Sequence, residues 1–211
     1  MPETPPASYT TLLALMRERR SIRRFRPENL PEGTLDRLME AARWAPSASN
    51  RQAFRFMAIE QPETRARMAE LVRAAVRTSV ERLPAEERAA AAAYTEDFVR
   101  FEHAPLVLVA YYRTGNVLGE RLGLPPERDV GAIASVSAAI MNLLLAAHAL
   151  GLGACWMTGP LVAGSELETY LGIPSGWVLA AVMPVGFPDE NPPAPARRST
   201  SHLLVRSGGS P

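Results

Sequence analysis

The chain has 211 residues, 47% of them hydrophobic and 21% charged, and its formal net charge is +1. This length and composition indicate one globular domain with a sizeable core and exclude a disordered chain. The nearly balanced charge argues against a general nucleic-acid-binding protein, which would be basic over a whole face. The single cysteine, Cys155, excludes an intrachain disulfide and fits a reducing compartment.

The first half of the chain predicts helices around one strand. Residues 1–7 are rich in proline and are expected to be flexible, and Ser8 is a candidate cap for the first helix. The expected elements are, in order, a helix from Ser8 to about Arg19, a helix between Pro31 and Pro46, a half-buried strand over 53–60, and one or two helices over 62–101 that break near Pro84.

The second half predicts buried strands on either side of a long apolar helix. The expected elements are a central strand over 104–113, a loop or lid over 114–127, a helix over 129–150, a strand over 154–158, a helix over 161–171, a buried strand over 177–186, a proline-rich extended arm over about 188–205 and a flexible tail over 206–211. Because the strands do not alternate regularly with helices, the pattern favours a single α+β domain over 8–205, with a sheet wrapped by helices.

The stretch 130–165 has no charged residue and admits two interpretations. A membrane span needs about 20 apolar residues, which this stretch supplies. However, it is rich in alanine, serine and glycine, contains Asn142 and His148, and has no second stretch like it. These features favour a buried core helix. The first apolar run precedes the basic residues, the reverse of a signal peptide. We therefore expect a cytoplasmic protein without membrane contact.

Motifs for metal and phosphoryl-transfer chemistry are absent from the sequence. The three histidines, His103, His148 and His202, stand without ligand spacing, and there is no C-x-x-C, H-E-x-x-H or P-loop. The G-x-G of "GLGACW" follows a helix and leads into a strand, the reverse of a dinucleotide-binding fingerprint. Cys155 lies in an apolar strand, where a cysteine is more often a core residue than a nucleophile. We expect no metal site.

Three polar segments stand out in this apolar chain. In the first, five of the eight residues from Arg19 to Arg26 are arginine, although the chain has no lysine. The second, "APSASNRQAF" (45–54), offers hydroxyls, amides and backbone N–H groups to a ligand with many oxygens, but such residues are also ordinary in a turn. The third is Arg197–Arg198 in the arm, and such pairs are usually just solvated.

Four blocks in this order resemble the nitroreductase / flavin reductase family of FMN enzymes. The blocks are "RRSIRRF", "APSASNRQAFRF", "GLGACWMTGP" and "PVGFP" followed by the arginine pair, and they cover nearly the whole chain. The resemblance implies a central mixed, mainly antiparallel sheet wrapped by helices, in an interlocked homodimer. Two FMN sites would lie at the dimer interface, and the arm would reach across the partner. The family's usual Gln-Pro-Trp is here Gln52-Ala53-Phe54.

The resemblance also implies which residues bind FMN. Arg19 and Ser21 would bind the phosphate, Arg20 would contribute mainly backbone, and Arg23 would lie beside the pyrimidine end of the flavin. Thr158 and Gly159 would present backbone to the ring near N5. The full implied cofactor-binding set is Arg19, Arg20, Ser21, Arg23, Pro46, Ser47, Asn50, Gln52, Met157, Thr158, Gly159, Pro160, Arg197 and Arg198. Arg24 and Arg26 match no flavin role and are expected to be solvated.

The implied activity is that of an oxidoreductase with no catalytic side chain of its own. FMN would take hydride from NAD(P)H at N5 and pass electrons to a small nitroaromatic, quinone or similar acceptor by a ping-pong scheme. Two alternatives keep the fold: reductive dehalogenation, and flavin breakdown as in dimethylbenzimidazole synthesis. A third, from another class, is a non-enzymatic dimer that binds an anion or nucleic acid through 19–26, which the charge balance disfavours.

Overall fold

The computed structural model describes residues 5–115, 119, 121–123, 130–205 and 207. Its elements are α1 (Ala7–Glu18), α2 (Thr34–Arg43), η1 (Ala48–Asn50), β1 (Phe54–Ile59), α3 (Pro62–Glu81), α4 (Ala85–Thr95), η2 (Glu96–His103), β2 (Leu106–Arg113), α6 (Gly131–Ala149), β3 (Gly153–Ala154), η4 (Gly159–Ala163), α7 (Gly164–Tyr170), β4 (Trp177–Gly186) and η5 (Thr200–His202), where η marks a short 3-10 helix. The predicted loop or lid over 114–127 lies mostly outside the described residues.

The centre of the molecule is a four-stranded sheet in the order β1-β2-β4-β3. All three pairings are antiparallel, and β2 pairs with β4 along its whole length, with a bulge between Ala110 and Tyr111. An isolated parallel bridge joins Ser21 to Ala154 at the β3 edge. The predicted α+β fold with a mixed, mainly antiparallel sheet is therefore confirmed.

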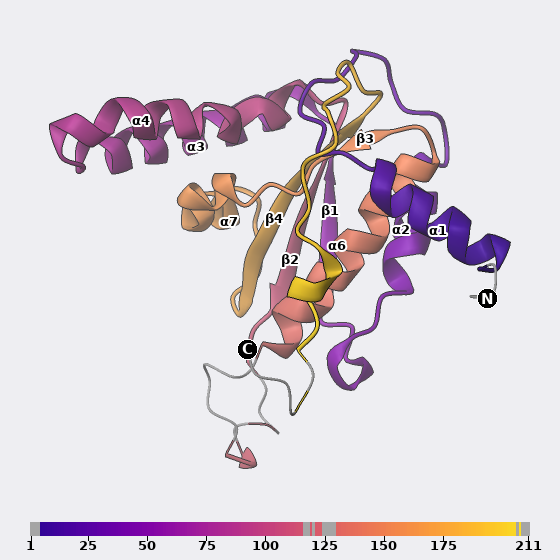
Figure 1. Ribbon diagram of the computed structural model, residues 1–211. Helices are drawn as coiled ribbons and strands as arrows, with labels where there is room; N and C mark the ends of the chain where they lie inside the picture. The colour runs from indigo at the N-terminus through magenta and orange to yellow at the C-terminus, as the bar shows by residue number, and fades with distance from the viewer. Residues whose placement is uncertain (1–4, 116–118, 120, 124–129, 206, 208–211) are drawn as a thin grey trace.

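Helices cover both faces of this sheet, which gives a three-layer arrangement (Figure 1). Side chains alternate along a strand, so Leu108 packs toward α2 and α6, whereas Val107 and Val109 pack toward α3, η2 and α7. Phe101 of η2 is fully buried on the same side of the sheet as Val107 and Val109. With apolar partners on both sides, β2 reads as a continuous apolar run, which is why the sequence identified it readily.

The long apolar helix α6 lies on the sheet and contacts α2, β2 and η1. By length and composition it meets the criteria for a membrane span, but this is weak evidence, since core helices of soluble proteins meet them too. Its buried side chains include Val136, Ile140 and Leu143, which join the core below α2. The helix is thus a core element along one side, and 44% of its most apolar window is buried.

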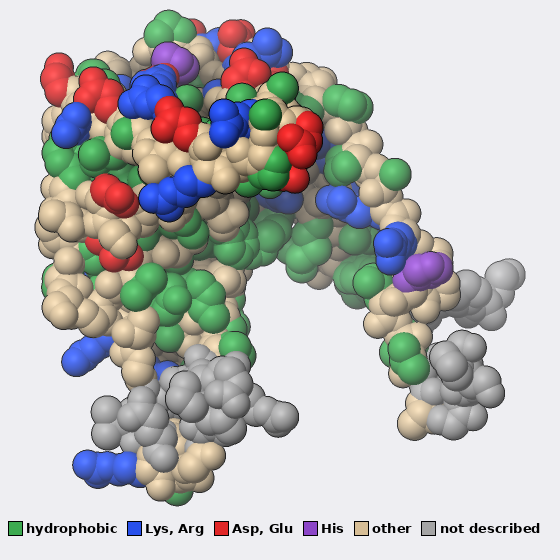
Figure 2. Space-filling view, turned by 90° about the vertical axis from the view of Figure 1, so that its left-hand side faces the viewer, with side chains coloured by type: hydrophobic (Ala, Val, Ile, Leu, Met, Phe, Trp, Pro, Cys, Tyr) green, Lys and Arg blue, Asp and Glu red, His purple; other side chains and the backbone are tan. Residues whose placement is uncertain are grey.

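Three segments extend from the body. The α3–α4 hairpin projects to one side in Figure 1, and α4 has no buried residue. Helix α1 also buries none of its residues and exposes Tyr9, Leu12 and Met16. After β4 the chain forms an arm, 189–199, without helix or strand. Figure 2 shows this arm standing away from the body, with hydrophobic side chains on the surface between them.

Several predicted boundaries differ from the structure. Ser8 does not cap α1, because the helix already begins at Ala7 and Pro6 occupies the cap position without a side-chain bond. The strand predicted over 154–158 is shorter, since ladder pairing ends at Ala154 and only Met157 bridges β4 again. The helix predicted over 161–171 is two elements, η4 and α7.

Candidate functional site

The arginine-rich segment is held at the β3 edge of the sheet. The Ile22 N–H donates to the Ala154 carbonyl at 3.1 Å, and the Arg26 N–H donates to Phe187 at 3.0 Å. Ile22 and Phe25 are buried and fix the segment by packing. Gly153 allows the close approach, because a Cβ there would lie 2.7 Å from the Ile22 side chain. The segment is therefore a fixed part of the fold, and its arginines have defined positions.

Acidic and aromatic neighbours divide the arginines. Arg24 pairs with Glu190 at 3.3 Å, and Arg26 pairs with Glu28 at 3.4 Å and lies 5.0 Å from the centre of the Phe187 ring. Both side chains are exposed, as expected for arginines without a ligand, but both have internal partners. The Arg20 guanidinium donates to the backbone carbonyls of Arg17 and Arg19 at 2.6 and 2.8 Å, so its side chain is bonded to nearby backbone.

Arg19 is left with an unsatisfied donor. Among the described residues, its Nε is buried and has no hydrogen-bond partner. It lines a cavity of about 210 Å³ whose wall also includes His148, Gly151 and Glu190. A buried guanidinium N–H without an acceptor is costly, so this position favours an anionic ligand. His148, which the sequence left without a role, lies beside the same cavity.

Ser21 and Arg23 face a neighbouring cavity of about 350 Å³, lined by Ser21, Arg23, Arg24, Asp97, Arg100, Glu190 and Pro192. Side chains two residues apart in an extended segment point the same way, so the spacing of Arg19, Ser21 and Arg23 predicts a common face for all three. The structure places Ser21 and Arg23 on one cavity and Arg19 on the adjacent one. The prediction was wrong for Arg19 because the segment forms isolated bridges and is not one continuous strand.

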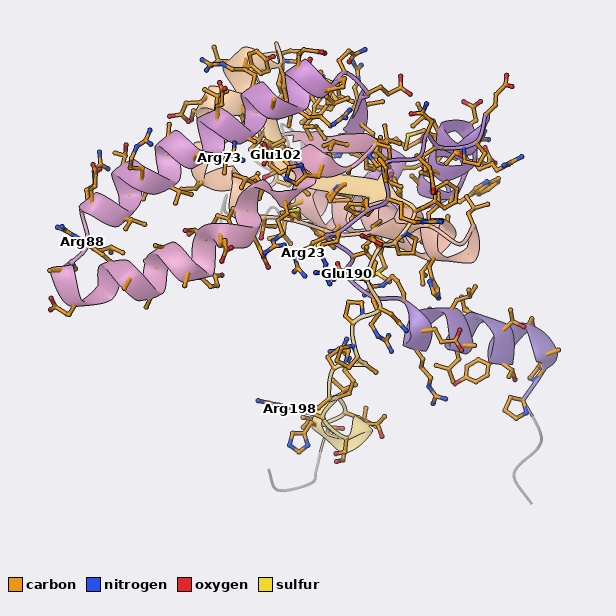
Figure 3. All side chains as sticks on the ribbon, turned by 90° about the horizontal axis from the view of Figure 1, so that it is seen from above. Arg23, Arg73, Arg88, Glu102, Glu190 and Arg198 are labelled. Carbon is orange, nitrogen blue, oxygen red and sulfur yellow. The ribbon has the colours of Figure 1, made fainter. Side chains whose placement is uncertain are left out.

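Glu190 joins the arginine segment to the base of the arm (Figure 3). Its Oε1 accepts the N–H groups of Arg23 and Arg24 at 2.5 and 3.0 Å, and the side chain is only 17% exposed. No local pattern indicates this contact, because its partners lie more than 160 positions apart. The carboxylate fixes the backbone of Arg23 and Arg24 and occupies their N–H groups, which are then not available to a ligand.

Helix η2 adds residues that the sequence did not indicate. Asp97 lies 3.9 Å from Arg23 through its Oδ2 and pairs with Arg100 through its Oδ1. Phe98 packs against Gly159, where a Cβ would overlap the aromatic ring. At the base of the hairpin, Arg73 of α3 pairs with Glu102 of η2, as Figure 3 shows. The predicted residues 157–160 and the arginine segment therefore share η2 as a common neighbour.

Met157 and Pro160 are buried, whereas Thr158 is exposed and Gly159 is half-buried. The Met157 N–H donates to Val182 at 3.1 Å, which fixes the start of this turn on β4. Cys155 is almost completely buried below Ser21. Burial raises the pKa of the Cys155 thiol above its ordinary value, while Arg23 and a hydrogen bond with Ser21 oppose this only in part. This protonated, inaccessible thiol agrees with the core role expected for Cys155.

The second polar segment, 46–52, forms a separate loop before β1. Ser49, Asn50 and Gln52 all have positive φ, at 52°, 51° and 48°. Non-glycine residues rarely adopt this conformation, and strained residues of this kind cluster at active sites and ligand clamps. The Ala48 N–H donates at 3.0 Å to the hydroxyl of Ser135, a buried residue of α6 that the sequence also did not indicate.

One chain does not bring the two halves of the predicted site together. The loop ends at Ala53, whose carbonyl accepts from Arg113 opposite Trp177, at the start of β4. Ser21 bridges Ala154, which pairs with Val185 near the other end of β4. Eight residues of strand separate these points, which is roughly 26 Å, and β1 and β3 are opposite edges of the sheet.

The two halves are therefore the "edge half" (Arg19, Arg20, Ser21, Arg23 and 157–160) and the "loop half" (46–52). The third predicted segment meets neither of them. Arg197 and Arg198 are exposed, and Figure 3 shows Arg198 far along the arm from Arg23. Both arginines lie beyond the point after Glu190 at which the arm leaves the body.

Sequence and structure comparisons agree on one family. Residues 16–187 match the model of the Nitroreductase family. The chain is 32% identical over 90% of its length to 5,6-dimethylbenzimidazole synthase of Rhodospirillum rubrum, covering 88% of that protein. It is 30% identical over 82% of its length to NADH dehydrogenase of Thermus thermophilus, covering 84% of that protein.

A solved structure extends this agreement to the fold. Iodotyrosine deiodinase bound to FMN and 3-iodo-L-tyrosine superposes with a TM-score of 0.73 and 25% identity, over 94% of this chain and all of that one. The family model spans most of the chain, and the sheet and its helical layers match this relative. The chain belongs to the nitroreductase family.

Proposed function

We propose that this protein is an FMN-dependent oxidoreductase that takes electrons from NAD(P)H and passes them to a small electron-poor acceptor such as a nitroaromatic compound or a quinone. The observation that carries the proposal is the edge half, where Arg19, Ser21 and Arg23 line two adjoining cavities in a chain of this family. The iodotyrosine deiodinase relative is described as bound to FMN, and the Thermus relative is named as an NADH dehydrogenase.

The edge half fits a flavin phosphate. The buried Nε of Arg19 lacks an acceptor among the described residues, and a phosphate oxygen would supply one. Ser21 offers a hydroxyl donor in the adjoining cavity. Guanidinium groups bind phosphate oxygens in a planar, paired geometry. Arg24 and Arg26 already have carboxylate partners. Arg19 has no carboxylate partner among the described residues, and the Arg23 side chain has only the longer contact of 3.9 Å with Asp97, so these two are the arginines proposed to meet the ligand.

Each residue then has a separate task. Arg19 and Ser21 bind the phosphate, and Arg23 places a positive charge beside the pyrimidine edge, where it stabilises negative charge. Thr158 and Gly159 present backbone to the ring near N5, and Pro160 follows at its edge. When bound, FMN supplies the redox chemistry, accepting hydride from NAD(P)H and passing electrons to the acceptor. The fold supplies binding, orientation and electrostatics.

The loop half requires a second chain in this proposal. Roughly 26 Å of strand separates the halves within one chain, so Pro46, Ser47, Asn50 and Gln52 would reach a flavin held at the edge half of a partner. The exposed apolar residues of α1, Tyr9, Leu12 and Met16, are available to cover such an interface. The arm with Arg197 and Arg198 would close on the partner's site. A homodimer and a cytoplasmic location are parts of the proposal.

A second candidate function keeps the flavin but changes the reaction. The similarity to a dimethylbenzimidazole synthase favours flavin breakdown, and the similarity to iodotyrosine deiodinase favours reductive dehalogenation. Purified protein reconstituted with FMN should be assayed without oxygen against nitroaromatic, quinone and iodotyrosine acceptors, with NADH and with NADPH. A parallel reaction in oxygen should be analysed for loss of flavin and formation of dimethylbenzimidazole.

The decisive experiment for the proposal is a visible absorption spectrum. We expect purified or FMN-reconstituted protein to show flavin bands that bleach on addition of NADH or NADPH and return with a nitroaromatic or quinone. A correctly folded protein that stays colourless after incubation with FMN would refute the flavin proposal. Flavin bands with turnover only of iodotyrosine, or only in oxygen with loss of flavin, would assign one of the alternatives.

A further inference from the structure

The loop half has a strained backbone that its own hydrogen bonds do not attach to the body. Ser47 accepts the Asn50 N–H at 2.9 Å through its carbonyl and the Gln52 N–H at 3.1 Å through its hydroxyl. The Gln52 amide donates to the Asn50 side chain at 3.2 Å. These bonds close the loop on itself. The three positive-φ residues still raise its energy, so an outside contact is needed to hold this conformation.

Ser135 supplies that contact from α6. Its side chain is buried at 6% exposure, and its Oγ accepts the Ala48 N–H at 3.0 Å. The same hydroxyl donates its proton to the Gly131 carbonyl, one helical turn earlier, at 2.5 Å. Because the proton is committed to Gly131, an oxygen lone pair is left for Ala48. The hydroxyl is thereby fixed in orientation and acts as an acceptor.

The bond is made at the first residue of η1, immediately before the strained positions. Ser47 is extended, with φ −134° and ψ 146°, and the chain reverses after Ala48. At the other end the loop is attached to β2, because the Arg113 N–H donates to Ala53 at 2.9 Å. The loop is thus attached to the body at both ends, to the sheet at Ala53 and to α6 through Ser135. A longer bond, from the exposed Arg51 side chain to the Gly115 carbonyl at 3.4 Å, does not involve the strained backbone.

We propose that Ser135 is a positioning residue that holds the loop half in its cofactor-binding conformation. The inference rests on the proposed function, since the cofactor concerned is the FMN that the loop half would bind. Ser135 does not touch the flavin in this proposal. It acts through Ala48, whose hydrogen bond to the α6 hydroxyl keeps Ser47 and Asn50 at fixed positions relative to that helix.

The test compares FMN dissociation constants, measured by quenching of flavin fluorescence, for wild type and Ser135→Ala. Alanine favours helix and matches the small neighbours in α6, so the variant should fold. We expect binding about tenfold weaker, or about 1.4 kcal/mol, because the Ala48 N–H loses its acceptor and the loop samples other conformations. Ser137→Ala removes a hydroxyl from the same helix two residues later and should leave the constant unchanged.

Three further measurements separate positioning from a merely structural role. Ser135→Thr keeps the hydroxyl, and a helical threonine can also bond the carbonyl four residues earlier, so it should bind FMN within about threefold of wild type. In the apoprotein, amide hydrogen exchange at Ala48 should be faster in Ser135→Ala than in wild type. The melting temperature of the apoprotein reports on global stability.

The outcomes are distinct. A lower apoprotein melting temperature with unchanged FMN binding would overturn the inference and leave Ser135 as a packing residue. Unchanged exchange at Ala48 would also overturn it. If wild type itself binds no FMN, the proposed function fails and the cofactor part of the inference fails with it. Exchange at Ala48 would then still show whether Ser135 holds the loop.

Discussion

At the scale of single residues, the molecule sorts five neighbouring arginines by what each contacts. Arg24 and Arg26 are paired with carboxylates, and Arg20 bonds nearby carbonyls. Of these five, only Arg19 has a buried donor without an acceptor among the described residues. Arg19 and Arg26 carry the same charge, but we expect Arg19 to contribute more to ligand binding, because its donor has no partner whereas Arg26 already has one.

Replacement of Arg19 tests this distinction. We expect Arg19→Ala to weaken FMN binding by roughly tenfold to a hundredfold, the range expected for a charge-assisted hydrogen bond of about 1.5–3 kcal/mol. Arg26→Ala is the matched control, because it removes an equal charge from the same segment but only an exposed ion pair and a ring contact. Flavin retained per chain after dialysis measures both, and equal retention in the two variants would contradict the assignment.

At the scale of elements, η2 connects the arginine segment to the turn at 157–160. Asp97 lies beside Arg23, and Phe98 packs on Gly159. The sequence placed a helix in this region but could not show that it contacts the site, because both contacts are made across more than 60 residues of chain. The glycine is needed for space, since η2 passes where a larger side chain would be.

The fit between η2 and η4 predicts an asymmetric response to alanine. Gly159→Ala should lower stability by about 1–3 kcal/mol through overpacking against Phe98 and should shift the flavin spectrum, since the adjoining turn moves. Gly164→Ala, five residues later, meets no atom within 4 Å and should be neutral or slightly stabilising. Thermal melting of both variants checks this, and a Gly159→Ala melting temperature at or above that of Gly164→Ala would contradict it.

At the scale of the whole molecule, the proposed site needs parts from opposite ends of the sheet. The edge half lies by β3, and the loop half lies by the start of β1. A twofold dimer pairs such ends reciprocally, so each chain gives its edge half to one site and its loop half to the other. The same geometry accounts for an arm whose arginines contact neither half of their own chain.

Mixing two variants that are each weakened in FMN binding tests whether the site is shared. Arg19→Ala damages the edge half, and Asn50→Ala damages the loop half. If each site is built from two chains, refolding an equal mixture should restore about a quarter of the wild-type sites, because half of the dimers are mixed and one site in each is intact. FMN bound per chain after refolding measures this. No recovery, with mixed dimers verified by differently tagged chains, would place each site within one chain.

The sequence by itself determined the elements and the chemistry available to them. Apolar runs located β2, β4 and α6 to within two residues, because strands buried on both faces form continuous apolar runs and the α6 stretch has no charged residue. The order of the motifs indicated the family. The arginine part of the edge half, residues 19–23, could be named because its residues are close together in the chain.

Only the tertiary structure decided which of these residues meet. Glu190 reaches Arg23, Ser135 reaches Ala48 and Phe98 packs on Gly159 across long sequence separations that no local pattern records. The physical reason is that the sheet register sets these distances. That register brings the first arginines to β3 and leaves the loop at the far end of β4, so a single chain holds two incomplete halves.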